Sequence, residues 1–192
     1  MSKAKYFPLV LVAIMSALGT IIYMMFPEIP LVPGVEYLKV DLSDIPALVT
    51  GLTIGPQFGV VVELIKNIIH LSRTATFGIG ELMNICIGSC MIYSMWFFMK
   101  ICGRFIKSDR NSVKVYYVSS ALSIVASIIC GWILNAALTP LFYTLAHIPL
   151  TFTSVMVGVW SSTLLNAIKC AVTVLPFWPL IRILQTLAKK LS

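Results

Sequence analysis

Several side chains that can bind ligands stand within long apolar stretches of this 192-residue chain. Asn84, Asn135, Asn166 and Lys169 each have mainly apolar neighbours, and Asn166 and Lys169 have the spacing that places two residues on one helix face. Amides both donate and accept hydrogen bonds, and a lysine donates them. A group rich in amides, with one cation, is typical of a site for a neutral or weakly acidic ring compound that carries carbonyl and hydroxyl groups.

A second polar group has the spacing of a single helix face. The stretch VVELIKNIIH contains Glu63, Lys66 and Asn67 at relative positions i, i+3 and i+4. Glu63 and Lys66 neutralise each other, and the sequence leaves open whether they contact a ligand or only one another. We also expect Lys66 to reach an aspartate of the preceding charged stretch, which contains Asp41 and Asp44.

The sequence patterns of several catalytic and metal-binding classes are missing. There is no GxxxxGK[ST], HExxH or GxSxG. The sequence therefore lacks the motifs typical of ATP hydrolysis, of zinc metalloproteases and of serine hydrolases. The five cysteines lie in apolar runs without zinc-ligand spacing, and Cys86 and Cys90, one turn apart, fit small apolar packing better than a metal. An intramembrane enzyme with Lys169 or a cysteine as nucleophile would need an adjacent base, and Glu63 is already matched by Lys66. We expect no enzyme activity, no catalytic residue and no metal site.

The composition places these residues in a lipid bilayer. Hydrophobic residues make up 59% of the chain and charged residues 11%, with a mean hydropathy of +0.96. A soluble domain carries about 25% charged residues. The net charge of +7 comes mostly from clusters of basic residues near both ends and in 100–114. Because no basic patch alternates with aromatic residues in a soluble segment, we expect no nucleic-acid partner.

The apolar stretches predict an all-α membrane protein with six transmembrane helices in a single domain, 1–192. Gly55 and Pro56 divide one long stretch into two short ones, since proline begins a helix but interrupts its interior. We expect Ser43 or Asp44 to cap the second helix, and the sixth helix to begin near Gly158. The predicted spans are 7–26, 44–55, 57–71, 80–102, 115–140 and 155–185.

The basic clusters predict the orientation of these spans. With the N-terminus inside, the clusters at both chain ends and in 100–114 all fall on the cytosolic side. The outer loops are then 27–43, 72–79 and 141–154. We therefore expect both termini to be cytosolic.

The first predicted span carries small residues at helical spacing. Ala13 and Ala17 are one turn apart, and we expect Ser16 and Gly19 near the same surface. Small residues allow helices to approach closely in lipid. On spacing alone, packing against another helix of the same chain is the simplest interpretation.

The blocks LKxDxSDIP in 38–46 and GPxxGxxxExxKN in 55–67, followed by ELMNICIGS and by NAIK in the last span, resemble the riboflavin-specific S components of energy-coupling-factor (ECF) vitamin transporters. The similarity extends in order over nearly the whole chain. It implies a multi-pass subunit of the bacterial plasma membrane that binds riboflavin near the outer face as a transported ligand, without a cofactor. It also implies an ECF module as partner, made of a transmembrane coupling protein and two cytosolic ATPases that drive release inside.

The resemblance also implies roles for individual residues. The loop 27–43 would close over the site as a lid, with Asp41, Ser43 and Asp44 fixing its exit. Ala13 and Ala17 would contact the coupling protein, in place of the internal packing that spacing favours. The implied ligand contacts are Tyr37, Leu38, Lys39, Asn135, Asn166 and Lys169, where amides and lysine hydrogen-bond the pyrimidine edge and ribityl hydroxyls of the flavin.

Other transport functions stay open at this stage. An S component for another vitamin or precursor, such as flavin mononucleotide, a pyrimidine or folate, would share these features. A freestanding secondary transporter would need an inverted repeat and a coupling-ion site, and the sequence shows no clear sign of either.

Overall fold

The computed structural model describes residues 6–25, 29–30, 39–40, 42–74, 76–107, 109, 112–147, 149 and 151–191, and these are largely helical. The helices are α1 (Phe7–Met25), α2 (Asp44–Ile54), α3 (Pro56–His70), α4 (Ile79–Phe105), α5 (Val113–Leu145), α6 (Phe152–Val174) and α7 (Trp178–Leu191). Two 3₁₀ segments and one strand pair complete the described elements: η2 (Leu71–Arg73), η3 (Leu175–Phe177), β1 (Ile29–Pro30) and β2 (Lys39–Val40).

The described helices correspond to the six that the sequence predicts. The first five match α1 to α5, and the sixth corresponds to α6, η3 and α7, which follow one another directly along the chain. Four stretches of the described chain are long and apolar enough to cross a membrane: α1, α4, α5 and the stretch Phe152–Ala188. The helices α2 and α3 have 11 and 15 residues, whereas a bilayer needs about 20. They make up the short second and third members of the bundle.

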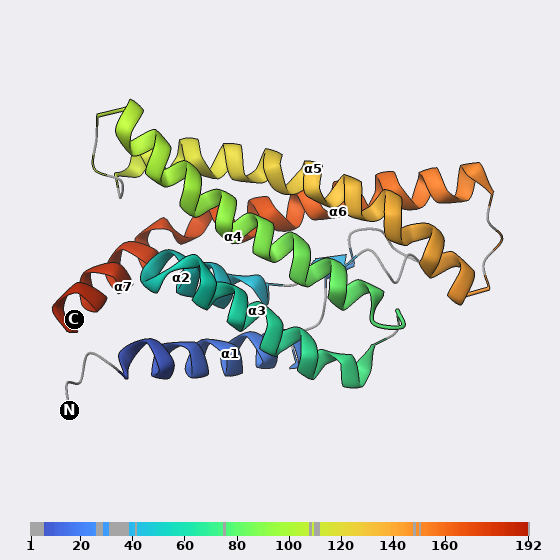
Figure 1. Cartoon of the computed structure of the whole chain (residues 1–192), viewed down its shortest axis with the longest axis horizontal. Coiled ribbons are helices and arrows are strands. Elements are labelled where there is room, and N and C mark those ends of the chain that lie inside the picture. Colours follow the sequence, from blue (N-terminus) through green and yellow to red (C-terminus); the bar gives the residue numbers. More distant parts are fainter. Residues whose placement is uncertain are drawn as a thin grey trace.

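The short helix α2 lies at the centre of the bundle. It contacts α1, α3, α4, α6 and α7, and in Figure 1 the long helices α4, α5 and α6 lie beside the group formed by α1, α2 and α3. Ala47, Leu48 and Val49 of α2 are at most 1% exposed. Protein therefore surrounds α2 and shields its ends, where lipid would leave backbone polar groups without partners.

The turn between α2 and α3 lies at Gly55, as the sequence predicts. Gly55 has φ 130° and ψ 146°, a backbone conformation that residues with a Cβ rarely adopt, and Pro56 begins α3. The two helices then run back along each other in close contact. A Cβ on Gly59 would lie only 2.6 Å from the carbonyl oxygen of Ala47 and 2.9 Å from Cα of Gly51.

Three local expectations were wrong. Ser43 precedes α2 in a helical conformation instead of the extended one typical of an N-cap, and its side chain makes no capping hydrogen bond with the described part of the helix but accepts one from Lys66. The helix α5 continues past Pro140 to Leu145. The helix α6 begins at Phe152 rather than near Gly158, because Thr151 and Ser154 form a capping box there.

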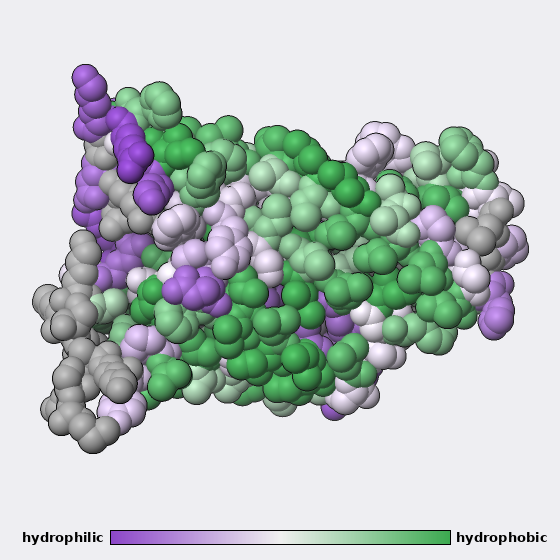
Figure 2. Space-filling view, in the orientation of Figure 1, coloured by the Kyte–Doolittle hydropathy of each residue, from purple (hydrophilic) through white to green (hydrophobic). Residues whose placement is uncertain are grey.

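Charged and apolar surfaces are separated along the molecule. Figure 2 shows an apolar middle and a hydrophilic end at the α4–α5 connection, where exposed Lys100, Arg104, Lys107 and Lys114 lie. In Figure 1, α1 begins and α7 ends at this same end. Many exposed side chains of the middle region are large and apolar, as a lipid-facing surface requires.

Candidate ligand-binding site

A single carboxylate joins two buried lysines from different helices. Asp44 begins α2, and its Oδ1 contacts Nζ of Lys66 in α3. Its other oxygen, Oδ2, lies 3.0 Å from Nζ of Lys169 in α6. The expected contact between Lys66 and an aspartate is therefore present, and Asp44 also reaches Lys169. The side chains of Asp44, Lys66 and Lys169 are 5%, 0% and 10% exposed, so this is an interior ion-pair system.

Amides and a glutamate close this system into a ring. Lys169 Nζ donates to Oδ1 of Asn84 at 2.5 Å, and Asn84 Nδ2 donates to Oδ1 of Asn67 at 3.0 Å. Asn67 Nδ2 donates to the backbone oxygen of Glu63 at 2.8 Å and to its Oε2 at 3.2 Å. Glu63 Oε2 lies 3.0 Å from Lys66 Nζ, which returns the ring to its start. We call the set Asp44, Glu63, Lys66, Asn67, Asn84 and Lys169 the polar ring.

Small residues of neighbouring helices enclose the polar ring. A Cβ on Gly19 of α1 would lie 3.6 Å from Cδ of Lys66, and one on Gly88 of α4 would lie 2.9 Å from Cδ of Glu63. The Tyr23 ring lies 5.7 Å from Lys66 Nζ. With both carboxylates and both amines ionised, the ring has no net charge, which is the arrangement that makes buried charge tolerable in a membrane.

Two further amides, Asn135 and Asn166, lie along the contact between α5 and α6. Asn135 of α5 is 1% exposed, and its Nδ2 has no hydrogen-bond partner within the described part of the chain. One turn earlier on α5, a Cβ on Gly131 would lie 3.1 Å from Nδ2 of Asn166. The helices α5 and α6 are antiparallel, with Gly131 opposite Asn166 and Thr139 opposite Gly158, so Asn135 and Lys169 lie on opposite sides of Asn166 along this contact. We call Asn135, Asn166 and Lys169 the amide seam.

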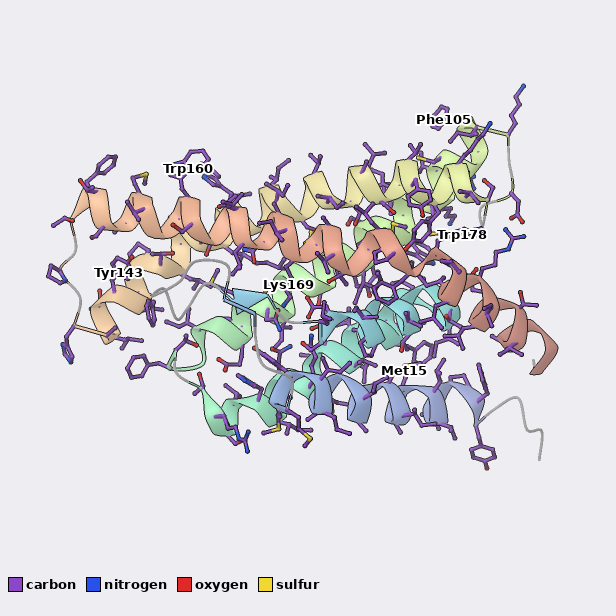
Figure 3. All side chains as sticks on the ribbon, turned by 180° about the vertical axis from the view of Figure 1, so that it is seen from behind. Met15, Phe105, Tyr143, Trp160, Lys169 and Trp178 are labelled. Carbon is purple, nitrogen blue, oxygen red and sulfur yellow. The ribbon has the colours of Figure 1, made fainter. Side chains whose placement is uncertain are left out.

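Lys169 lies inside the bundle, as Figure 3 shows, although other residues of α6 face outward. Trp160 on the same helix is 64% exposed and points away from the bundle in this view. A buried amide donor without a partner costs free energy, about 1–3 kcal/mol in proteins. The Nδ2 of Asn135, which has no partner among the described residues, is therefore a donor that a hydrogen-bonding ligand would satisfy.

The two ends of the expected lid are paired with each other. β1 and β2 are antiparallel, with Ile29 opposite Val40 and Pro30 opposite Lys39, and β2 contacts α6. The described residues thus bring the exit of the loop next to the helix that carries Asn166 and Lys169. Tyr37, Leu38 and Asp41, three of the predicted lid residues, lie outside the described residues.

The small residues of α1 do not form the single surface that spacing suggested. Ala13 and Ala17 are exposed, whereas Ser16 and Gly19 are buried. A Cβ on Gly19 would approach the backbone oxygen of Ser43 to 3.3 Å, so this part of α1 packs on the start of α2. Ser16 and Gly19 therefore serve internal packing, and Ala13 and Ala17 lie on the outer surface of α1.

A separate polar cluster joins α1, α3 and α4 near the α3–α4 connection. His70 Nδ1 lies 2.9 Å from Glu81 Oε1, and Thr74 Oγ1 donates to Glu81 Oε2 at 2.9 Å. The imidazole ring also stacks on Tyr23, with the ring centroids 3.7 Å apart. This cluster fixes the end of α1 from which the chain leaves towards β1.

The link between Asp44 and Lys169 and the role of Gly88 as a lining residue were not predicted from the sequence. Helical spacing could relate Lys66 to Glu63 within α3, because both belong to one short segment. Asp44 and Lys169 lie in the second and the last helix, and no local pattern connects them. Gly88 is one of several glycines in apolar runs, so its type alone carried no signal.

Comparison with known proteins gives the family. Residues 8–181 match the family described as ECF transporter, substrate-specific component. The chain is 30% identical over 149 residues to the riboflavin transporter RibU of Lactococcus lactis subsp. cremoris (strain NZ9000), covering 76% of this chain and 68% of that protein. It is 32% identical over 142 residues to the riboflavin transporter FmnP of Bacillus subtilis (strain 168), covering 71% and 68%.

A solved structure described as the S component of a bacterial ECF transporter has the same fold. It matches with a TM-score of 0.73 at 22% identity, over 96% of this chain and 99% of that one. The chain belongs to the substrate-specific components of ECF transporters. It is accordingly a multi-pass membrane protein that acts in transport rather than as an enzyme, and it associates with an ECF module.

Proposed function

We propose that this protein captures riboflavin for ATP-driven uptake, as the substrate-binding subunit of an ECF transporter. The observation that carries the proposal is the amide seam, where Asn135 has a buried Nδ2 without a hydrogen-bond partner in the described part of the chain, on the same α5–α6 contact as Asn166. The names of the relatives from L. lactis and B. subtilis agree with this substrate.

The chemistry of the amide seam suits a flavin. The pyrimidine edge of a flavin presents carbonyl oxygens and N–H groups, and its ribityl chain presents hydroxyls. Asn135 and Asn166 can donate and accept, and Lys169 donates, so together they match both kinds of group. Such a site also rejects analogues that lack these groups, because the protein's own buried polar atoms would then stay unpaired. Asn84 remains a further predicted contact through its link to Lys169.

The loop 27–43 would complete the site as a lid. Tyr37 and Leu38 would cover the faces of the flavin rings, and Lys39 would contact its polar edge. The paired β1 and β2 support this role, because they hold the two ends of the loop together beside α6.

The binding test is a titration of the detergent-purified protein with riboflavin, followed by quenching of flavin fluorescence. We expect saturable binding at nanomolar concentrations. Asn135→Leu and Lys169→Met should each raise Kd at least tenfold, about 1.4 kcal/mol. Gln57→Leu is the control, because Gln57 is an exposed amide at the start of α3 and should leave Kd unchanged.

Two outcomes would contradict parts of this proposal. If the wild-type protein does not bind riboflavin, the substrate is wrong, and flavin mononucleotide, pyrimidines and folate become the compounds to titrate. If the wild type binds but neither substitution changes Kd, riboflavin is right and the amide seam is not the site.

We propose further that both termini are cytosolic and that the module contains a transmembrane coupling protein and two cytosolic ATPases. Ala13 and Ala17 would contact the coupling protein, since both are small and exposed on α1. Ala17→Trp should abolish co-purification of the module while riboflavin binding stays intact. Val125→Trp, at an exposed position of α5, is the matched control. Retained co-purification of the Ala17 variant would place the docking surface elsewhere.

A further inference from the structure

We propose that Asp44 is a positioning residue for ligand binding, which acts by holding the ammonium of Lys169 at the amide seam. The inference rests on the proposed function, since it takes Lys169 as a ligand contact. It assigns to Asp44 an effect on affinity that passes through Lys169 rather than through contact with the ligand.

Two acceptors on different helices fix the Lys169 ammonium. Asp44 Oδ2 lies 3.0 Å from Nζ and belongs to α2, and Asn84 Oδ1 lies 2.5 Å from Nζ and belongs to α4. A lysine side chain has a flexible four-carbon stem and loses considerable rotamer freedom when it is fixed. Acceptors that fix it before the ligand arrives remove that loss from the binding step, which increases affinity.

The rest of the polar ring keeps Asp44 in place. Its Oδ1 is held by Lys66 Nζ, which also donates to Ser43 Oγ at 2.9 Å and pairs with Glu63 Oε2 at 3.0 Å. Asp44 is also the first residue of α2, where a negative charge interacts favourably with the helix dipole. Lys66 and Glu63 thus support Asp44, and Asp44 in turn presents one oxygen to Lys169.

The position of Asp44 in the chain relates this contact to the lid. β2 ends at Val40, shortly before α2 begins at Asp44, and β2 lies against α6. The carboxylate that holds Lys169 therefore also ties the exit of the loop to α6. A ligand that contacts both the loop and Lys169 would meet two elements that are already fixed to each other.

A double-mutant cycle separates positioning from a general effect on the fold. Riboflavin Kd is measured for the wild type, Asp44→Asn, Lys169→Met and the protein with both changes. We expect Asp44→Asn to raise Kd at least tenfold when Lys169 is present and less than threefold when Lys169 is already methionine. A residue with only a structural role, or one that contacts the ligand directly, would raise Kd by the same factor in both backgrounds, and that result would overturn the proposal.

A second variant guards against loss of folding by charge imbalance. Asp44→Asn alone leaves the polar ring with an excess positive charge, whereas Asp44→Asn combined with Lys66→Met restores a balance between Glu63 and Lys169. This variant should run as a single species in size-exclusion chromatography and bind riboflavin as weakly as Asp44→Asn. Recovery of wild-type affinity would show that charge balance, and not the position of Lys169, sets Kd. A wild type that does not bind riboflavin would instead refute the proposed function.

Discussion

The replacement Lys66→Met tests whether the polar ring is an ion-pair system that the fold depends on. Lys66 is fully buried, and its Nζ contacts Asp44 Oδ1, Ser43 Oγ and Glu63 Oε2. Methionine keeps an unbranched apolar stem of similar shape, so the change removes the ammonium with little loss of packing. Two buried carboxylates then face each other with one remaining cation, Lys169.

The expected loss of unfolding free energy follows from the carboxylates that Lys66→Met leaves without their lysine. Removing one member of a buried ion pair costs about 3–5 kcal/mol, whereas an interhelical hydrogen bond in a membrane protein averages about 0.6 kcal/mol. Because Lys66 pairs with two carboxylates, we expect the ion-pair value to apply and not the hydrogen-bond value. Lys66→Met should therefore lower the free energy of unfolding by about 3–5 kcal/mol. Adding Glu63→Gln should recover more than half of this loss, because it leaves Asp44 balanced by Lys169.

The measurement is reversible unfolding of the purified protein in mixed micelles with increasing sodium dodecyl sulfate, followed by circular dichroism. Lys114→Met is the matched control, since Lys114 is an exposed lysine at the start of α5 and should change stability by no more than about 0.5 kcal/mol. A loss below about 1 kcal/mol for Lys66→Met would refute the reasoning. So would a further loss when Glu63→Gln is added, because then the carboxylate would be favourable without its lysine.

Three more predictions concern the surroundings of the site. Gly88→Ala places a Cβ 2.9 Å from Cδ of Glu63, so we expect the same unfolding assay to show a loss of about 1–3 kcal/mol. Gln185→Ala removes a hydrogen bond of 2.6 Å to the backbone oxygen of Leu52, and hydrogen exchange should show faster opening at the end of α2. Asn135→Leu removes a buried amide nitrogen that has no partner in the described part of the chain, so the ligand-free protein should gain about 1 kcal/mol of stability while it loses affinity. Unchanged unfolding of the Gly88 or Asn135 variant would contradict the corresponding prediction. Unchanged hydrogen exchange at the end of α2 would contradict the prediction for Gln185.

Much of the architecture follows from the sequence, since the membrane penalises polar groups segment by segment. Apolar stretches between polar connections predict where helices lie, and the turn at Gly55 and Pro56 follows from the backbone limits of these two residues. The cost of a polar side chain within an apolar run also singled out Asn135 and Lys169, whose side chains the structure places inside the bundle. These inferences need only neighbours along the chain.

Helix ends were less predictable, because alternative local partners have similar energies. Ser43 has the residue type of a helix cap, yet Lys66 donates to its hydroxyl, and Thr151 with Ser154 begins α6 earlier than expected. Spacing alone also placed Ser16 with Ala17 on one surface of α1, although α1 turns Ser16 inward and leaves Ala17 exposed.

The sequence by itself thus determined the class of the protein, the helices and which polar residues carry an unusual cost. Only the tertiary structure decided which of those residues meet: Asp44 from the second helix bridges Lys66 and Lys169, and Asn84 closes the contact from the fourth. The physical reason is that a buried charge must find a partner, while the sequence does not specify which of several distant carboxylates and amides that partner is. Packing around the central helix α2 makes that choice, because it brings the start of α2 between α3 and α6.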